Sequence, residues 1–159
     1  MSNEAQYPRI FVTGISGQLG QEVFRSWVGK AQLVGTCPEQ DWKVEGADVF
    51  HLDLTDKKPL QELIQKAKPD IIINCAAYTA VDASEEQKEI CHELNAEVPR
   101  VLAKEAKIQN ALLVHISTDY VFDGSGTLPK RETEIPNPLN QYGKSKLLGE
   151  KNVQTVGGN

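Results

Sequence analysis

The sequence is poor in cysteine and histidine, with 3 residues of each, and these are widely spaced with no CxxC pair. Spacing of this kind does not match the ligand sets that bind zinc, so we expect no metal site. Scattered cysteines, odd in number, are typical of reduced thiols in a cytoplasmic protein. The composition therefore favours neither a metal centre nor a disulfide framework.

The sequence also has no long apolar run and no excess of positive charge. No run approaches the roughly 20 apolar residues of a membrane helix, and the polar residues 1–8 lack the apolar centre of a signal peptide. Lys and Arg number 17 against 22 Asp and Glu, which gives a net charge of −5. Nucleic-acid-binding proteins usually present a basic face. We therefore exclude membrane and nucleic acid as main partners.

Short apolar runs alternate with helical patterns along the chain. Continuous β-branched runs are typical of parallel strands covered on both faces, and apolar residues three or four apart predict helices. Strands are predicted at residues 9–13, 32–36, 49–52, 70–75 and 111–116. Helices are predicted at residues 17–28, 60–67, 83–93, 96–107 and 140–153, where 83–93 and 96–107 are two helices or one helix bent near Pro99. This order predicts an α/β fold with a doubly wound parallel sheet, a single Rossmann domain over residues 1–159.

A glycine-rich loop follows the first predicted strand and opens the first predicted helix. Residues 14–20 read Gly-Ile-Ser-Gly-Gln-Leu-Gly, with the spacing G-x-x-G-x-x-G. Gly14 permits a tight turn, Gly17 lets the backbone approach a pyrophosphate, and Gly20 lets the helix lie close to the strand. An ordinary βα turn is the alternative, but the position after the first strand favours a dinucleotide site. The loop lacks the GK[ST] ending of nucleotide-triphosphate hydrolases.

Two acidic residues bear on the adenosine end of such a nucleotide. Asp53 follows the third predicted strand, where a carboxylate accepts a hydrogen bond from adenine; a helix cap or turn is its alternative role. An acidic residue at the end of the second strand binds the 2′-hydroxyl of NAD, and a basic one accommodates the 2′-phosphate of NADP. Here Cys37-Pro38-Glu39 follows that strand. Because Glu39 comes late for this role and no Arg or Lys is close, both nucleotides stay open.

Tyr142 and Lys146 form a Y-x-x-x-K pair in the last predicted helix. Residues four apart on a helix share a face, so the ammonium can lie near the phenol. Such a cation stabilises the phenolate, which would make the tyrosine a general acid for a developing alkoxide. Ser117 and Thr118 follow the last strand, at the edge where open parallel sheets bind ligands. A hydroxyl there can polarise a carbonyl, and a turn that closes the strand is the alternative.

Several stretches together resemble the dTDP-4-dehydrorhamnose reductases, which are extended short-chain dehydrogenase/reductases. They are the Gly-Gln-Leu-Gly of the glycine loop, Asn-Cys-Ala-Ala-Tyr-Thr-Ala-Val-Asp at 74–82, Ile-Ser-Thr-Asp-Tyr-Val-Phe-Asp-Gly at 116–124, and Pro-Leu-Asn-Gln-Tyr-Gly-Lys-Ser-Lys at 138–146, followed by Gly149-Glu150. The resemblance implies that NADPH or NADH reduces the 4-keto group of dTDP-4-dehydro-L-rhamnose to give dTDP-L-rhamnose. This nucleotide sugar is a precursor of cell-surface polysaccharides.

The resemblance also implies roles for individual residues. Thr118, Tyr142 and Lys146 match the catalytic Ser/Thr-Tyr-Lys set, in which Thr118 would bind the substrate oxygen and Tyr142 would donate the proton. Lys146 would tune Tyr142 and hydrogen-bond the nicotinamide ribose. The implied cofactor residues are Gly14, Gly17, Gln18, Leu19, Gly20, Asp53, Leu54, Cys75, Ala76, Ala77, Tyr142 and Lys146. The implied substrate residues are Tyr78, Thr79, Val81 and Tyr120, and packing is an alternative role for Tyr120.

The family is nearly twice as long as this chain, which stops at Gly157-Gly158-Asn159, just past the catalytic helix. The C-terminal substrate domain of the family is absent from it, so the chain is either a fragment or a naturally short protein. Because orientation depends on substrate contacts, we expect weak or absent turnover. The last strand would then form an apolar sheet edge, so we expect self-association through that edge, or a homodimer.

Two other functions fit the same residues. The β-subunit of methionine adenosyltransferase, a non-catalytic dinucleotide-binding regulatory subunit, is similar in fold and in its Asp-Tyr-Val-Phe-Asp-Gly run. Another sugar-nucleotide enzyme, above all a 4-epimerase, is the other alternative. The 4,6-dehydratases carry Thr-Asp-Glu at the strand end, whereas this chain has Thr118-Asp119-Tyr120 and lacks the glutamate.

Overall fold

The computed structural model describes residues 7–126 and 128–157. The strands are β1(Arg9–Thr13), β2(Gln32–Cys37), β3(Ala47–His51), β4(Ile71–Asn74) and β5(Leu112–His115), and the longer helices are α1(Gln18–Trp27), α2(Lys57–Ala67), α4(Val98–Gln109) and α5(Gln141–Val156). Residues 1–6 of the polar segment 1–8, for which the sequence predicts no signal peptide, lie outside the described residues, as do the last two residues. No helix in the described part of the chain is long and apolar enough to cross a membrane.

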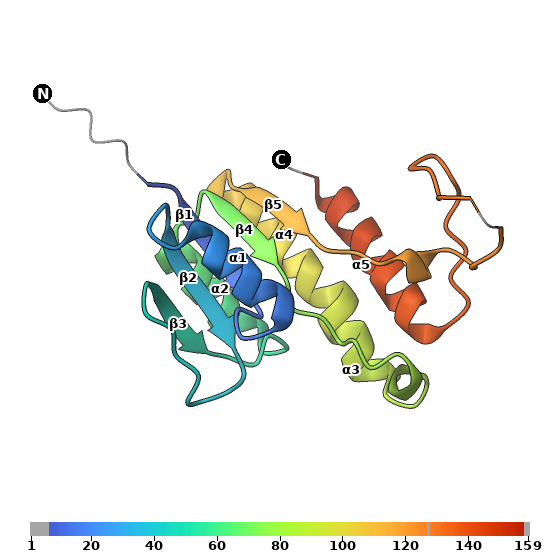
Figure 1. Ribbon diagram of the computed structural model, residues 1–159, viewed down its shortest axis with the longest axis horizontal. Coiled ribbons are helices and arrows are strands. Elements are labelled where there is room, and N and C mark those ends of the chain that lie inside the picture. The colour runs from blue at the N-terminus through green and yellow to red at the C-terminus, as the bar shows by residue number, and fades with distance from the viewer. Residues whose placement is uncertain (1–6, 127, 158–159) are drawn as a thin grey trace, which may run out of the picture.

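Five parallel strands form one sheet in the order β3-β2-β1-β4-β5 (Figure 1). Thr13 is in register with Thr36 on one side and with Asn74 on the other, so three strands end at the same edge. From β1 the chain moves to β2 and β3 on one side and then to β4 and β5 on the other, so the switch point where doubly wound sheets bind ligands lies between β1 and β4. The predicted fold class is confirmed. As the sequence pattern indicated, β2 leads to β3 without an intervening helix.

Helices cover the sheet on both faces (Figure 1). On one face, α1 covers a buried cluster of Ile10, Val12, Ile15, Leu33 and Cys37. On the other, α2 and α4 cover Phe11 and Ile72 with buried side chains of their own, which include Leu60, Ile64, Val98 and Leu102. Burying each large apolar side chain contributes about 1.5–3 kcal/mol, so these two clusters fix the helices on the sheet. Helix α5 lies against α4, and the Asn152 side chain donates a hydrogen bond to the Ala96 carbonyl.

The face that α1 covers continues to β5 as an apolar surface without a helix over it in the described residues. Leu112 pairs with Ile71 and Val114 with Ile73, and both of those isoleucines pack in the α1 cluster. Leu112 is 47% exposed and Val114 is 38% exposed. Because β5 is also an edge strand, the predicted apolar sheet edge is present.

The helical region before β5 differs from the prediction. A 3-10 turn η1(Asp82–Glu85) precedes α3(Lys88–His92), which runs through a π-helical turn, η2(Glu93–Glu97), into α4. The irregularity lies just before Pro99, close to the position where the sequence predicted a bend. Pro99 stands in the first turn of α4, directly after the π-helical turn.

Candidate active site

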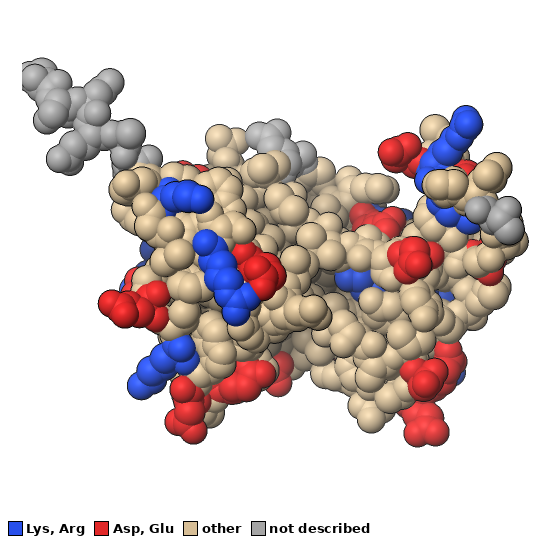
Figure 2. Space-filling view, viewed as in Figure 1, with Lys and Arg blue, Asp and Glu red and all other residues tan. Residues whose placement is uncertain are grey.

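A cavity of about 780 Å³ opens at the carboxyl edge of the sheet. This volume falls in the range of small-molecule and cofactor sites, about 300–1,000 Å³. Figure 2 shows a hollow on the viewed face between α1 and α5, and both helices contribute residues to the lining of the cavity. The predicted residues that line the cavity are Gly14, Gly17, Gln18, Leu19, Gly20, Asp53, Leu54, Cys75, Ala76, Ala77, Thr79, Tyr142 and Lys146. The fold thus brings together most of the predicted cofactor and catalytic residues.

The glycine loop forms one wall of this cavity. Gly14 has a φ of +66°, and the Gly17 N–H donates a 3.0 Å hydrogen bond to its carbonyl, which closes a tight turn. A Cβ on Gly20 would lie 2.1 Å from the Gly14 oxygen, so no side chain fits there. Helix α1 starts after Gly17 without a side-chain cap. Its first N–H groups therefore remain for an anionic ligand.

A chain of polar side chains lies at the ends of β1, β4 and β5. The Thr13 hydroxyl donates to the side-chain oxygen of Asn74 at 2.5 Å, and the side-chain nitrogen of Asn74 lies 3.0 Å from His115 Nδ1. Burial, assisted by the Lys146 charge, lowers the pKa of His115 to about 4. His115 is therefore neutral near pH 7, and its Nδ1 accepts the hydrogen bond from Asn74.

Helix α5 carries Tyr142 and Lys146 into the cavity. The side chain of Asn140 caps this helix by accepting a 2.8 Å hydrogen bond from the Gly143 N–H. Lys146 is 3% exposed, and its Nζ donates a 2.6 Å hydrogen bond to the Ile116 carbonyl at the end of the β5 segment. Burial lowers the pKa of Lys146, and the nearby Glu150 opposes this shift. The ammonium is thus held at the buried edge of the site.

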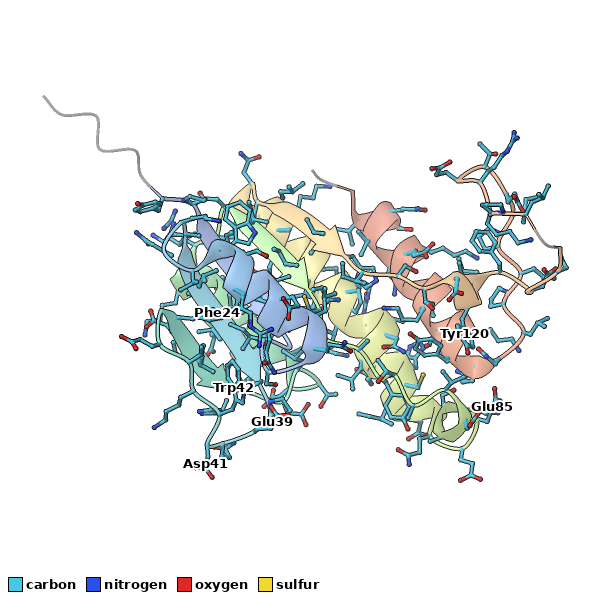
Figure 3. All side chains as sticks on the ribbon, viewed as in Figure 1. Phe24, Glu39, Asp41, Trp42, Glu85 and Tyr120 are labelled. Carbon is cyan, nitrogen blue, oxygen red and sulfur yellow. The ribbon has the colours of Figure 1, made fainter. Side chains whose placement is uncertain are left out.

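Tyr142 is nearly buried and its ring packs edge-on against Tyr120, with 5.5 Å between the ring centroids. Tyr120 is half-exposed and lies on the 3-10 turn η3(Asp119–Val121), beside the start of α5 (Figure 3). Its packing role is therefore present in the structure. Gly143 permits this close approach, since a Cβ there would lie 2.2 Å from the Tyr120 carbonyl oxygen.

Thr118 does not line the main cavity. Its hydroxyl accepts a 3.3 Å hydrogen bond from the Tyr120 N–H and caps η3, which matches the turn interpretation. Thr118 lines a neighbouring hollow between α5 and residues 121–136, and Ser117 lines the main cavity instead. The Ser117 hydroxyl donates to the Glu150 carboxylate. The catalytic role of Thr118 stays a prediction.

The other predicted substrate residues lie on the segment between β4 and α3. Thr79 lines the cavity, whereas the Tyr78 hydroxyl lies outside it and donates to Gln87 at 3.3 Å. Val81 directly precedes η1 and is also absent from the cavity lining. These three assignments stay predictions.

Asp53 reaches the cavity wall, but one of its carboxylate oxygens is engaged locally. This oxygen accepts hydrogen bonds from the Thr55 N–H at 2.9 Å and the Thr55 hydroxyl at 2.8 Å. The turn interpretation therefore describes part of what Asp53 does, and the contact with adenine stays a prediction. The residue that precedes α2 as its N-cap is Asp56.

Sequence reasoning missed Asn95, a 1% exposed residue in the π-helical turn η2. Its side-chain oxygen accepts from the Tyr78 N–H at 2.8 Å, and its amide donates to the Tyr78 carbonyl at 3.0 Å. The same amide donates to the Ser145 hydroxyl at 3.0 Å. Asn95 thus joins the segment after β4 to helix α5. The available signal was a polar residue at helical spacing between the apolar residues Cys91 and Val98.

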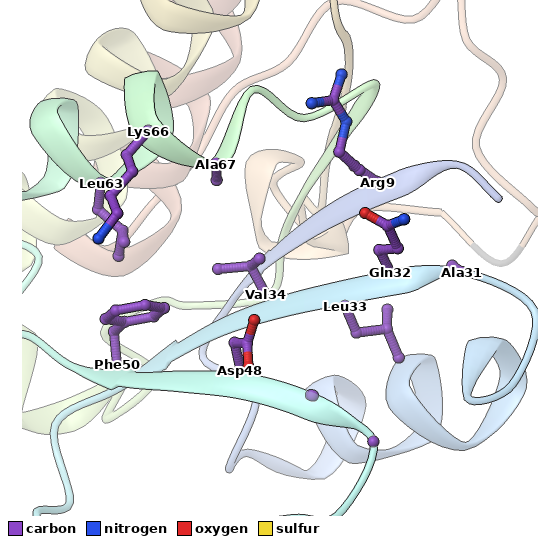
Figure 4. A pocket seen from close by; sticks show the side chains of 12 residues that line it. Arg9, Ala31, Gln32, Leu33, Val34, Asp48, Phe50, Leu63, Lys66 and Ala67 are labelled. Atoms are coloured by element: carbon purple, nitrogen blue, oxygen red, sulfur yellow. The ribbon is translucent and has the colours of Figure 1, made fainter. Parts of the chain in front are cut away.

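A second hollow of about 570 Å³ lies between β2, β3 and α2 (Figure 4). Its lining includes Arg9 and Gln32, the first residues of β1 and β2, together with Phe50 and Lys66. It therefore lies toward the amino end of the strands. None of the predicted site residues line it, so we take the cavity at the carboxyl edge as the candidate active site.

The parallel sheet, the glycine loop and the Tyr-Lys pair on α5 define a Rossmann-like domain of the dehydrogenase/reductase type. The chain belongs to the RmlD substrate binding domain family, whose model matches residues 8–159. It is 41% identical over 150 residues to the dTDP-4-dehydrorhamnose reductase of Burkholderia thailandensis, which covers 94% of the chain and 47% of the relative. It is 40% identical over 152 residues to methionine adenosyltransferase 2 subunit beta of Xenopus tropicalis, which covers 91% and 42%.

The crystal structure of dTDP-4-dehydrorhamnose reductase from Bacillus anthracis in complex with NADP is similar, with a TM-score of 0.79 and 34% identity. The similarity covers 96% of this chain and 51% of that one. The chain spans about half the length of the curated reductases it matches, 47% in one case and 46% in another. The resemblance seen in the sequence is confirmed, and the chain corresponds to the N-terminal portion of these relatives.

Proposed function

We propose that this chain is a single NAD(P)-binding Rossmann domain that carries the cofactor site and catalytic residues of a dTDP-4-dehydrorhamnose reductase. The observation that carries the proposal is that Tyr142 and Lys146 line the same cavity as the glycine loop. Relatives that are 41% identical bear that activity in their names. We expect the protein to act in the cytoplasm, and free thiols at Cys37, Cys75 and Cys91 fit that location.

The residues of the cavity fit a nicotinamide dinucleotide. Gly14, Gly17, Gln18, Leu19 and Gly20 would hold the pyrophosphate, since a loop this tight exposes N–H groups at the start of α1. Asp53 and Leu54 would contact the adenosine, and Cys75, Ala76 and Ala77 would contact the nicotinamide half. Burial raises the pKa of the Cys75 thiol to about 11, so this group adds no charge. When bound, NADPH or NADH supplies a hydride.

The chain's own residues would manage the proton and the substrate oxygen. The Tyr142 hydroxyl would donate its proton to the 4-oxygen of dTDP-4-dehydro-L-rhamnose, giving the 4-hydroxyl of dTDP-L-rhamnose. The Lys146 ammonium would stabilise the phenolate that remains. Thr118 would hold the same oxygen by exchanging its present hydrogen bond to Asp119. Tyr78, Thr79, Val81 and Tyr120 would contact the sugar nucleotide.

A single-turnover assay tests this proposal. The chain, in excess over dTDP-4-dehydro-L-rhamnose and NADPH or NADH, is mixed and the loss of reduced-nicotinamide absorbance is followed. We expect Tyr142→Phe to slow this loss by about 100-fold or more, because a positioned general acid contributes about 10²–10⁴-fold. Tyr7→Phe, at an exposed tyrosine outside the cavity, is the matched control. Loss of absorbance in the wild type, at a rate that the Tyr142→Phe variant equals, would contradict the assigned role.

A non-catalytic role is the second candidate, and the identity to the Xenopus tropicalis subunit favours it. In this case the cavity would hold the dinucleotide without reducing a ketone. The same assay separates the two functions if it is combined with a pull-down on methionine adenosyltransferase. Nucleotide binding and retention of that enzyme, without oxidation of the nucleotide by the sugar substrate, would favour the regulatory subunit. Another sugar-nucleotide reductase would oxidise NADPH or NADH with a different sugar substrate, whereas a 4-epimerase would invert C4 of its sugar nucleotide with no net oxidation of the nicotinamide nucleotide.

A further inference from the structure

The glycine loop is joined to the end of β2 by two hydrogen bonds. The Ile15 N–H donates to the Thr36 carbonyl at 3.0 Å, which ties the loop backbone to the strand. The Ser16 hydroxyl then donates to the Glu39 carboxylate at 2.8 Å. Ser16 and Pro38 both line the cavity. Glu39 therefore reaches the phosphate loop from the segment that follows β2. Its spacing in the sequence predicts a position too far past the end of this strand for a role at the nucleotide.

The backbone of Glu39 is fixed by a turn in the β2–β3 connection. The Trp42 N–H donates to the Glu39 carbonyl at 3.3 Å, and the Trp42 side chain packs against the buried cluster under α1 (Figure 3). The hydrogen bond from Ser16 lowers the pKa of Glu39, so its carboxylate is charged at neutral pH. A negative charge is thus held beside the glycine loop.

Positive charge is scarce at this end of the cavity. Lys146 lines the opposite end, where its Nζ binds the Ile116 carbonyl, and no other Lys or Arg lines the cavity in the described residues. The β2–β3 connection carries Asp41 and Glu45 besides Glu39, and its one basic residue is the exposed Lys43. The connection is therefore acidic on balance.

We propose that Glu39 makes this site selective for NADH over NADPH, an inference that rests on the dinucleotide site of the proposed function. The adenosine ribose of NADH offers 2′- and 3′-hydroxyl donors, which a carboxylate accepts. The 2′-phosphate of NADPH is an anion, which the Glu39 carboxylate repels and which needs a basic partner. The Bacillus anthracis relative is in complex with NADP. The proposed preference for NADH therefore rests on the residues of this chain and not on that relative.

The test is a fluorescence titration of the chain with NADH and with NADPH, for the wild type, Glu39→Gln and Asp41→Asn. We expect the wild type to bind NADH at least about tenfold more tightly than NADPH, as a close charge pair allows. In Glu39→Gln, the preference for NADH over NADPH should fall to about threefold or less, mainly because NADPH binds more tightly. Asp41→Asn removes a charge of the same sign two residues away, where no hydrogen bond to the loop is present. This variant should keep the ratio within about twofold of the wild-type ratio.

Three results would overturn the proposal. Equal binding of both nucleotides to the wild type would remove the preference while leaving the dinucleotide site intact. A preference that survives in Glu39→Gln, or is lost equally in Asp41→Asn, would show that Glu39 does not set it. Failure of both nucleotides to bind would remove the proposed function, and this inference with it.

Discussion

The side-chain amide of Asn95 donates a 3.0 Å hydrogen bond to the hydroxyl of Ser145, which lies between Tyr142 and Lys146 on α5. Ser145 in turn donates to the Tyr142 carbonyl at 2.7 Å, so its single proton is used and its oxygen accepts from Asn95. Asn95 also makes two hydrogen bonds to the backbone of Tyr78. One buried side chain therefore fixes the two segments that border the nicotinamide end of the proposed site.

This relationship predicts that Asn95→Ala destabilises the protein by about 2–4 kcal/mol, because it leaves several buried polar groups without partners. Urea unfolding measures the free energy of unfolding. Asn137→Ala is the matched control, since Asn137 is exposed and makes a single 3.4 Å contact, and we expect a change within about 0.5 kcal/mol. A loss in Asn95→Ala no larger than in the control would contradict the account of this network.

A second prediction concerns the pH dependence of stability. Burial lowers the pKa of His115 from 6.5 to about 4, so between these values the unfolded chain binds a proton that the folded chain does not. Stability therefore falls as the pH drops from about 6.5 to 4, by about 3 kcal/mol from this group, since one pKa unit corresponds to about 1.4 kcal/mol. His115→Gln removes the titration and keeps a hydrogen-bonding partner for Asn74.

Unfolding free energies of the wild type and His115→Gln, measured between pH 4.5 and 7.5, test this assignment. The carboxylates titrate in both proteins, so the difference between the two curves isolates the His115 imidazole. We expect the wild type to lose more stability on acidification than the variant. Parallel curves would mean that His115 is protonated equally in the folded and unfolded states.

A third prediction concerns the apolar sheet edge at β5. Leu112, Val114 and Ile116 are each more than a third exposed beside the unpaired backbone of this edge strand. Because such an edge invites strand pairing, we expect the chain to self-associate at micromolar concentration and Val114→Lys to reduce the association. Size-exclusion chromatography with light scattering measures the mass. A wild-type monomer over the whole concentration range would show that the edge is not an association surface.

Much of the fold could be predicted from the sequence because the spacing of apolar residues along the chain indicates where strands and helices lie. Continuous apolar runs such as Ile71 to Ile73 predicted parallel strands, and the glycine loop at Gly14 marked the switch point beside β1. The pair Tyr142 and Lys146 followed from helical spacing. These features depend on local spacing, which the sequence displays directly.

The remaining features depend on contacts between distant segments. Glu39 was judged too late along the chain, but the turn closed by Trp42 returns its carboxylate to Ser16. Asn95 in the π-helical turn bonds to Tyr78 and Ser145, which are 17 and 50 residues away in the sequence. Periodicity within one helix carries no information about such partners.

The central claim is that the glycine loop binds a nicotinamide dinucleotide, and Gly17→Val tests it most directly. Gly17 has an extended backbone that valine adopts, and an added Cβ would make one tight contact, 3.3 Å from the Gly14 oxygen, so we expect the variant to fold with a small shift of the loop. The fluorescence of NADH and NADPH is titrated with both proteins, and circular dichroism checks their folding. We expect saturable binding by the wild type and a dissociation constant at least about tenfold higher in the folded variant. Equal affinity in both proteins, or no binding by a folded wild type, would contradict the claim.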